Sequence, residues 1–377
     1  MIPKPYHLGC YCGHLFFIFK NMNTVRNFGF TLLFLASIAG CCQKPYNIFN
    51  GEYRYIEYKE DVESLTGEIV DIDDIEIRRT WIADTLLFAQ LASEWSPVEP
   101  DGWLSVYNLN NNQKLLKHLV LRGRGPNEYS SAETIRFFSD STGVKAWLLV
   151  NSREKIILVN VSASIQKQRL VVEKEIEFNL EDKYASLMVF YDSDTSFVVR
   201  SLFNNDQISI YNTVTERTHF ECWLYSEEYD YHSRNDMAAI YQYHPHKKIL
   251  AGGMAFFDQI NFYSLNGMNS FSISNNPKVM RYKNIKSIPI EERHDYLSNG
   301  CAGNEYLFFG YRPYNEKKDD NIAGVYLRIV SWEGALIKII RLDRTISGTS
   351  FDDRTGYLYG VDWNTDEILR YTIELMP

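Results

Sequence analysis

The chain has 377 residues, and 48 acidic against 39 basic residues give it a formal net charge of −9. This excess of negative charge argues against nucleic acid as a partner and against a basic membrane-binding surface, because both need clustered Lys and Arg. Aromatic residues make up 15% of the chain, a content that suits the faces of β-sheets. The length is sufficient for a sizeable core that needs no disulfide bonds.

The first 52 residues are predicted to lie outside the fold. Residues 1–21 precede a better start at Met22, and we interpret them as an upstream extension of the reading frame. Residues 22–40 have the layout of a secretory signal peptide, with Arg26 before an apolar stretch that ends in small residues. That stretch is short for a transmembrane helix. Residues 41–52 are expected to form a flexible tether.

Cys41 is the predicted site of lipid attachment. The sequence Ile38-Ala39-Gly40-Cys41 resembles the bacterial lipobox, in which the cysteine thiol is diacylated and becomes the new N-terminus. Two lipid chains are enough for stable anchoring. We therefore expect an exported protein that is lipid-anchored to the cell envelope, on the periplasmic face or at the cell surface. The alternative is an ordinary signal peptide followed by a chance cysteine.

One short pattern of alternating apolar and polar residues recurs along the rest of the chain. Four copies begin 52 residues apart, and two looser copies follow, with starts at Leu104, Ile156, Ile208, Ile260, Leu327 and Ile368. The alternation indicates a strand with one buried face. A fixed period of this size indicates one repeated supersecondary unit. A second apolar run precedes each copy, and we expect the two runs to be the middle strands of one sheet.

Six such units predict an all-β chain, folded over Tyr53–Pro377 as a six-bladed β-propeller of four-stranded antiparallel blades. The last unit has room for only about three strands. Because a ring must close, we expect an N-terminal strand from Tyr53–Ile77 to join the last blade, with Gly67–Ile77 as the segment that alternates well. A solenoid of β-units is the main structural alternative.

The segment from Arg122 to Tyr129 is the best candidate for a binding site. It occurs once, whereas a simple connector between blades should recur in every unit. The planar guanidinium groups of Arg122 and Arg124 suit carboxylates or phosphates, and Glu128 could pair with either. The alternative is an Arg–Glu pair that only locks the loop. The predicted ligand-binding residues are Arg122, Arg124, Asn127, Glu128 and Tyr129.

The same region carries a family resemblance. Leu121–Phe138 reads LRGRGPNEYSSAETIRFF, and it resembles the G-x-G-P-x-E-[FY] signature of the TolB-like six-bladed β-propeller lipoproteins of Bacteroidota. The motif at Cys41 and the six repeats fit the same family. The resemblance implies a six-bladed fold, lipid attachment and export. It implies no common activity, catalytic set or cofactor.

Two classes of function stay open, and we favour the first. One is a binding protein that takes a protein, peptide or glycan partner through loops on one face. The other is a hydrolase or lactonase with a metal in the central channel, which needs three or four inward-pointing Glu, Asp, Asn or His side chains from different blades. A purely structural envelope component is a third possibility. Convergent acids in the channel would favour the enzyme, and a mixed lining would favour the binding protein.

His244 and His246 are the one histidine pair that could approach a metal ion. Such a pair beside Lys247 and Lys248 is more often a solvated loop, and nothing in the sequence identifies a further ligand. We therefore predict no metal site, no catalytic residue and no cofactor.

Overall fold

The computed structural model describes residues 49, 51–57, 62–73, 77–91, 101–151, 154–178, 186–201, 207–225, 237–280, 282–312 and 325–375. The predictions for residues 1–21, residues 22–40 and the lipidation site Cys41 lie outside the described residues, as does most of the predicted tether. Among the described residues, no helix is long and apolar enough to cross a membrane.

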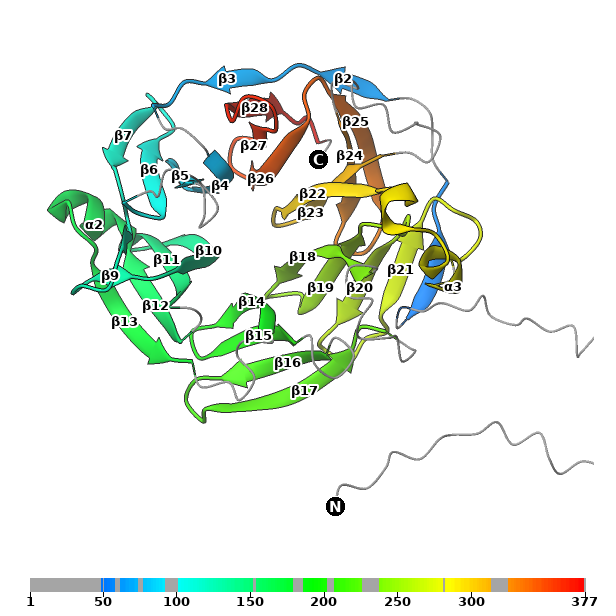
Figure 1. Ribbon diagram of the computed structural model, residues 1–377, viewed down its shortest axis with the longest axis horizontal. Coiled ribbons are helices and arrows are strands. Elements are labelled where there is room, and N and C mark those ends of the chain that lie inside the picture. The colour runs from blue at the N-terminus through cyan, green and yellow to red at the C-terminus, as the bar shows by residue number, and fades with distance from the viewer. Residues whose placement is uncertain are drawn as a thin grey trace, which may run out of the picture. The chain divides into compact units, whose positions relative to one another are not determined.

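Six sheets stand around a central axis, which confirms the predicted all-β, six-bladed propeller (Figure 1). The innermost strands contact one another in chain order, and the innermost strand of the last blade contacts that of the first. Blade 1 contains β4 (Ile77–Ala83), β5 (Leu86–Leu91), β6 (Leu104–Asn108) and β7 (Gln113–Leu116). Blade 2 contains β10 (Ala132–Asp140), β11 (Gly143–Val150), β12 (Lys155–Asn160) and β13 (Val172–Glu177).

The other four blades follow the same antiparallel order from the axis outward. Blade 3 contains β14 (Ser186–Ser193), β15 (Ser196–Ser201), β16 (Gln207–Asn212) and β17 (Arg217–Trp223). Blade 4 contains β18 (Ala239–His244), β19 (Ile249–Met254), β20 (Ile260–Ser264) and β21 (Phe271–Ser274). Blade 5 contains β22 (Leu297–Ala302), β23 (Tyr306–Tyr311), β24 (Val325–Ser331) and β25 (Leu336–Leu342). Blade 6 contains β26 (Ile346–Asp352), β27 (Tyr357–Asp362) and β28 (Ile368–Thr372).

Three N-terminal strands pair with the outer edges of successive blades (Figure 1). Strand β3 (Glu68–Val70) pairs antiparallel with β28 and is the fourth strand of blade 6. Two further strands were not expected from the sequence: β1 (Glu52–Tyr55) pairs in parallel with β21, and β2 (Glu63–Leu65) pairs in parallel with β25. The blades are therefore mainly, not wholly, antiparallel.

Packing begins upstream of Tyr53. Phe49 falls within the predicted tether, yet its backbone forms an isolated β-bridge with Tyr225. Its side chain is buried and packs edge-on against Phe257. An aromatic side chain next to apolar neighbours gains free energy by leaving water, so this end of the segment is held against blade 4.

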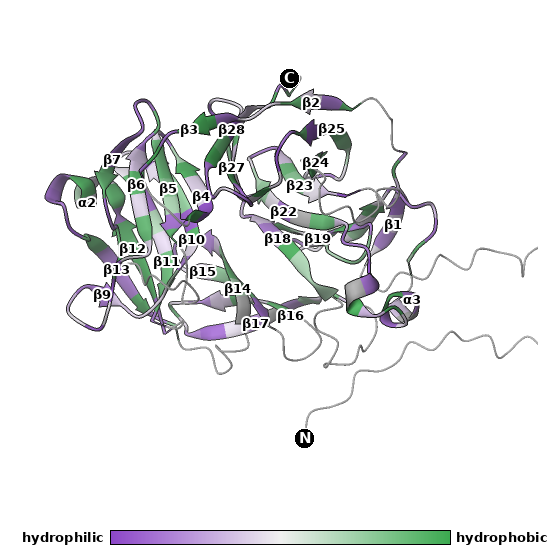
Figure 2. Ribbon diagram, turned by 45° about the horizontal axis from the view of Figure 1, so that its top comes forward, coloured by the Kyte–Doolittle hydropathy of each residue, from purple (hydrophilic) through white to green (hydrophobic). Residues whose placement is uncertain are grey.

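The repeated pattern forms the third strand of every blade, and the apolar run before it forms the second, as predicted. Burial differs from the expected one-sided pattern. In β6, Leu104, Ser105, Val106 and Tyr107 are all buried, although their side chains alternate between the two faces of the sheet. The middle strands of a propeller are covered on both faces because each blade packs against two neighbours. Figure 2 shows hydrophobic residues along these strands and hydrophilic residues in the connecting loops.

Each junction between blades has its own hydrophobic cluster in the described part of the chain, including the junction of the last blade with the first. There, Leu87 and Tyr107 of blade 1 pack with Val361 of blade 6. Burying one such aliphatic side chain contributes about 1.5–3 kcal/mol. The ring is therefore held together by side chains between the blades as well as by hydrogen bonds within them.

Short helices lie outside the sheets. Helix α2 (Val161–Lys167) follows β12, and Asn160 caps it by accepting the Ala163 N–H at 2.8 Å. Helix α3 (Tyr282–Lys286) and the 3₁₀ helix η3 (Ile290–Glu292) lie between β21 and β22.

Candidate functional site

A cavity of about 860 Å³ lies among the innermost strands of all six blades. We call it the central channel. Its lining includes Trp81 of β4, Arg136 of β10, Tyr191 of β14, Gln242 of β18, Asn299 of β22 and Ser350 of β26. The volume falls within the range of about 300–1,000 Å³ typical of small-molecule sites.

The innermost strands are irregular where they line the channel. Five of the six have a register shift against the second strand of their blade, and only β18 pairs without one. Such shifts re-aim side chains and are common beside functional sites. In blade 1 the shift lies between Ile77 and Arg79, and in blade 2 it lies between Thr134 and Arg136.

Arg79 and Arg136 occupy equivalent positions in these two blades. Each directly follows its register shift, and each stands four residues before the last paired residue of its strand, Ala83 or Asp140. Both side chains line the central channel. The strands that carry them, β4 and β10, are in contact.

The two guanidinium groups lie on aromatic rings rather than on carboxylates. The Cζ atom of Arg79 is 5.1 Å from the ring centre of Trp81. The Cζ atom of Arg136 is 4.8 Å from the ring centre of Tyr191, which belongs to the next blade. Within the described part of the chain, neither guanidinium forms an ion pair.

Burial shifts the protonation of both arginines in the same direction. Channel solvent reaches the Arg79 side chain, yet protein surrounds it, and this burial lowers the pKa of its guanidinium; the nearby Cys301 thiol opposes the shift. Burial also lowers the pKa of Arg136, against the opposing influence of Tyr191 and Asp194. The surroundings of both groups therefore disfavour the positive charge that arginine keeps at neutral pH.

The lining contains the carboxylates Glu133, which is exposed, and Asp353. Both oxygens of Asp353 accept the backbone N–H of Asn304, at 2.9 and 3.1 Å, and burial raises the pKa of this carboxyl. Arg78, which also lines the channel, has Asp366 as a partner at 4.0 Å. The lining is thus mixed, with aromatic rings, amides, two carboxylates, and the arginines Arg79 and Arg136, which form no ion pair among the described residues.

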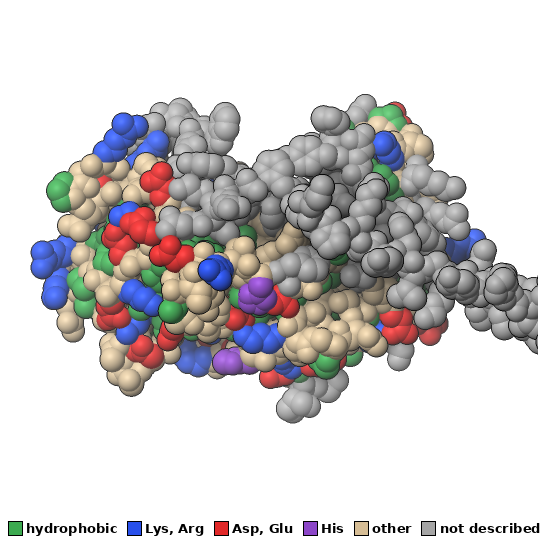
Figure 3. Space-filling view, turned by 90° about the horizontal axis from the view of Figure 1, so that it is seen from below, with side chains coloured by type: hydrophobic (Ala, Val, Ile, Leu, Met, Phe, Trp, Pro, Cys, Tyr) green, Lys and Arg blue, Asp and Glu red, His purple; other side chains and the backbone are tan. Residues whose placement is uncertain are grey.

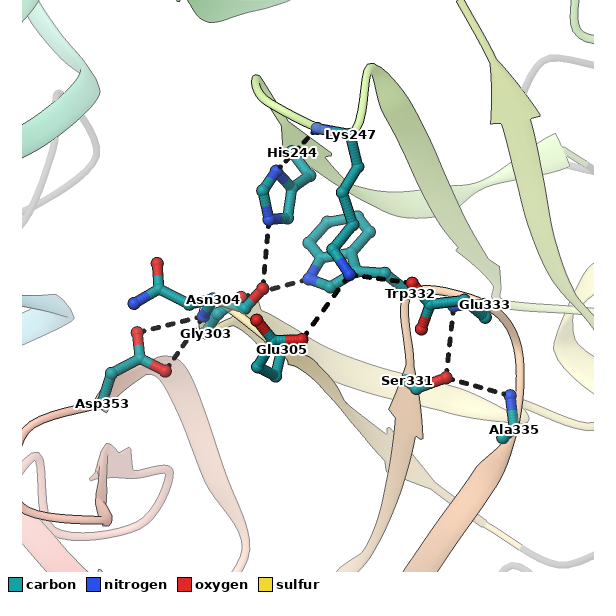
Figure 4. Close-up of polar contacts among 10 residues, drawn as sticks. All are labelled: His244, Lys247, Gly303, Asn304, Glu305, Ser331, Trp332, Glu333, Ala335 and Asp353. Atoms are coloured by element: carbon teal, nitrogen blue, oxygen red, sulfur yellow. Dashed lines mark hydrogen bonds and ion pairs between the residues drawn. The ribbon is translucent and has the colours of Figure 1, made fainter. Parts of the chain in front are cut away.

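One rim of the channel is tied together across three blades by the turn Gly303–Glu305 (Figure 4). Trp332 Nε1 donates to the Gly303 carbonyl at 3.2 Å, within blade 5. His244 Nε2 of blade 4 lies 3.1 Å from the Asn304 carbonyl, and Asp353 of blade 6 accepts the Asn304 N–H. Lys247 Nζ adds ion pairs with Glu333 at 2.8 Å and Glu305 at 3.6 Å.

These contacts leave no free nitrogen on the His244 ring. Its Nδ1 accepts the Lys247 backbone N–H at 3.2 Å, so a neutral ring with its proton on Nε2 satisfies both contacts. Burial lowers the pKa of His244, and the positive Lys247 and the neighbouring His246 act in the same direction. The ring thus holds the rim in place and has no lone pair left for a metal ion.

We expect the difference in stability between wild type and His244→Gln to depend on pH. The folded protein disfavours protonation of His244, whose ordinary pKa is 6.5, so folded chains take up fewer protons than unfolded chains as the pH falls through that value. The contribution of His244 to stability is therefore lost as the pH falls below about 6.5. Urea unfolding at several pH values from 7.5 to 5 should show the advantage of wild type over His244→Gln shrinking. Parallel stability profiles would contradict this role.

The predicted ligand-binding residues lie in another place. They connect β7 of blade 1 to β10 of blade 2, where β8 (Leu121–Arg122) and β9 (Glu128–Tyr129) form a small parallel pair. Because the strands of a blade are antiparallel, such a connection lies at the end of the propeller opposite to the turn Gly303–Glu305. None of the five residues is among the described residues that line the channel.

Contacts within this loop occupy several of its groups. The Glu128 carboxylate accepts the Gly125 N–H at 2.8 Å, and a Cβ atom on Gly123 would lie 2.0 Å from Glu128 Oε2. Arg122 stacks on Trp103, with 5.3 Å from Cζ to the ring centre, and Tyr129 is buried. Arg124 and Asn127 are exposed. Glycine at position 123 is thus required by the close approach of the Glu128 side chain.

No three His, Cys, Asp or Glu side chains gather as a set of metal ligands within the described ranges.

Comparisons with known proteins found similarity to solved structures only. No protein-family model and no curated protein matches it. Among solved structures, it is similar to a member of the DUF4221 family from Bacteroides vulgatus, at 11% identity over 84% of this chain and 97% of that one, with a TM-score of 0.48. It is also similar to a putative exported protein from Bacteroides fragilis, at 12% identity over 86% and 99% of the two chains, with a TM-score of 0.47. The WD40 repeats of RRP9 give 11% identity over 83% and 100%, with a TM-score of 0.46.

Sequence reasoning missed the two channel arginines. A weak signal was present, since Arg79 and Arg136 each precede an aromatic residue by two positions, Trp81 and Phe138. Nothing in that pattern indicates that both strands border one channel, because they belong to different sheets.

Proposed function

We propose that this protein is an exported, lipid-anchored binding protein whose ligand is a peptide or glycan segment that enters the central channel. The observation that carries the proposal is the 860 Å³ cavity, to which all six innermost strands contribute. A site built on strands is rigid, and rigidity lowers the ordering cost of binding.

The character of the propeller's outer wall also favours the central channel as the binding surface. On the side of the molecule drawn in Figure 3, acidic and basic side chains are interspersed among the described residues, and hydrophobic side chains are scattered. Broad hydrophobic patches are what usually mark protein docking surfaces. The mixed, concave channel is the better candidate.

Several finer parts of the proposal rest on the sequence. Lipid attachment at Cys41, and kinship with the TolB-like propeller lipoproteins of Bacteroidota, rest on the motifs at Cys41 and Leu121–Phe138. A contribution of Arg122, Arg124, Asn127, Glu128 and Tyr129 to binding stays a prediction. Among these residues Arg124 and Asn127 are exposed and available to a partner.

Site-specific photo-crosslinking tests which surface binds. A benzophenone amino acid replaces Glu133 or His246, two exposed residues that line the channel, in cells that produce the full chain. The comparison positions are Arg124, in the predicted loop, and Thr218, an exposed residue on the outermost strand of blade 3. The proposal predicts adducts from position 133 or 246 and none from position 218. Adducts only from 124 or 218, or from no position, would contradict it.

A further inference from the structure

We infer that Arg79 and Arg136 together form an anion-binding site in the wall of the central channel, which takes a carboxylate or phosphate group of the ligand. This inference rests on the proposed function and specifies the chemistry of the ligand.

The placement of the two residues is the first step. Arg79 and Arg136 follow equivalent register shifts on β4 and β10, and these strands are in contact. Because the same register shift occurs in two neighbouring blades, two arginine side chains line adjacent parts of the channel wall. Both residues line the same cavity, so a ligand in the central channel is exposed to both guanidinium groups.

The positive charge of the two guanidinium groups, which no carboxylate balances among the described residues, is the second step. Two other arginines of the described residues have a carboxylate partner: Arg328 Nη2 lies 2.9 Å from Asp258, and Arg344 Nη1 lies 2.8 Å from Asp362. Arg79 and Arg136 form no ion pair among the described residues. Arg136 is half-buried and Arg79 is open to channel solvent, so both can meet an anion in the channel. Planar guanidinium groups match carboxylate and phosphate oxygens in pairs.

Aromatic rings beside the arginines are the third step. Trp81 of blade 1 lies 5.9 Å from Phe137 of blade 2 between ring centres, and Phe137 stacks on Phe88 at 3.8 Å. These rings fix the wall from which Arg79 projects, while Tyr191 supports Arg136 from blade 3. Both guanidinium groups are therefore positioned by aromatic rings and form no ion pair among the described residues.

Titration with defined anions tests the inference on the full chain purified in detergent. The probes are inorganic phosphate, succinate and, as a neutral comparison, glucose, at constant ionic strength. Isothermal calorimetry should detect phosphate or succinate binding to the wild-type protein, and the better probe shows whether phosphate or carboxylate is preferred. Arg79→Gln and Arg136→Gln should each weaken that binding at least about tenfold, because hydrogen bonds to charged groups are strong.

Arg341→Gln is the matched control. Arg341 also lies on an aromatic ring, 5.9 Å from the centre of Tyr326, but it is exposed on β25 and does not line the channel. This variant should bind the anion as wild type does. Without anion, Arg79→Gln and Arg136→Gln should unfold at the wild-type temperature or above it, since each removes an unpaired charge. A marked loss of stability would indicate a structural role instead.

Binding of phosphate and succinate that is absent, or equal in wild type and both channel variants, would overturn the inference. The proposed function would survive that result if adducts still formed from position 133 or 246. Absence of those adducts would overturn the proposed function, even if the anions bound at the two arginines.

Discussion

Replacing Arg328 by methionine is expected to lower the free energy of unfolding by about 3–5 kcal/mol. Arg328 of blade 5 and Asp258, in the loop after β19 of blade 4, form a buried ion pair at 2.9 Å, with side chains 3% and 8% exposed. The Arg328 guanidinium also stacks on Tyr311, with 3.8 Å from Cζ to the ring centre. Methionine fills similar space but leaves the Asp258 carboxylate buried without a counter-charge. Urea unfolding of the full chain measures the loss.

The double variant Arg328→Met/Asp258→Leu is the control for this prediction. It removes both charges, and a buried ion pair replaced by apolar residues of similar volume often costs little or is stabilising. We expect it to recover most of the stability that Arg328→Met loses. If the double variant were as unstable as the single one, loss of packing rather than a stranded charge would explain the effect.

Replacing Trp147 by alanine is the second large effect, with an expected loss of about 3–5 kcal/mol. Trp147 is 1% exposed in the cluster between blades 2 and 3. Its ring meets Phe197 edge-on at 5.6 Å and stacks near Tyr191 at 6.4 Å, so alanine would open a cavity beneath the ring that supports Arg136. Thermal or urea unfolding measures the loss.

The variant Trp147→Phe separates the effect of the aromatic ring on stability from the effect of the indole nitrogen. The Trp147 Nε1 is buried and has no hydrogen-bond partner within the described residues, so phenylalanine removes an unsatisfied donor and keeps most of the packing. We expect less than half of the alanine effect. An equal loss in both variants would contradict this account, because a phenyl ring would then stabilise the junction no better than alanine does.

The repeat was the most predictive part of the sequence because a constant spacing survives changes of individual residues. It located the third strand of every blade, from Leu104 in β6 to Ile368 in β28, and hence the number of blades. The parallel strands β1 and β2 were missed, since each is only a few residues long and its partners lie more than 200 residues away in the chain. Burial on both faces was missed because local alternation reports nothing about neighbouring blades.

The candidate site was less predictable for a similar reason. The loop at Arg122–Tyr129 was predicted as a site because it occurs once and because its glycines and arginines lie close together in the sequence. Arg79 and Arg136 are 57 residues apart and become a pair only when β4 and β10 meet at the axis. Their register shifts depend on strand pairing, which no local sequence pattern encodes reliably.

The most direct test asks in one measurement whether a ligand binds in the central channel and whether the two channel arginines are needed for that binding. Photo-crosslinking from position 246 is repeated in cells that produce the full chain with Arg79→Gln and Arg136→Gln together. Our account predicts an adduct in the parent protein and its loss in the double variant, while Arg341→Gln leaves it intact. An adduct that persists undiminished in the double variant would contradict ligand recognition by the channel arginines.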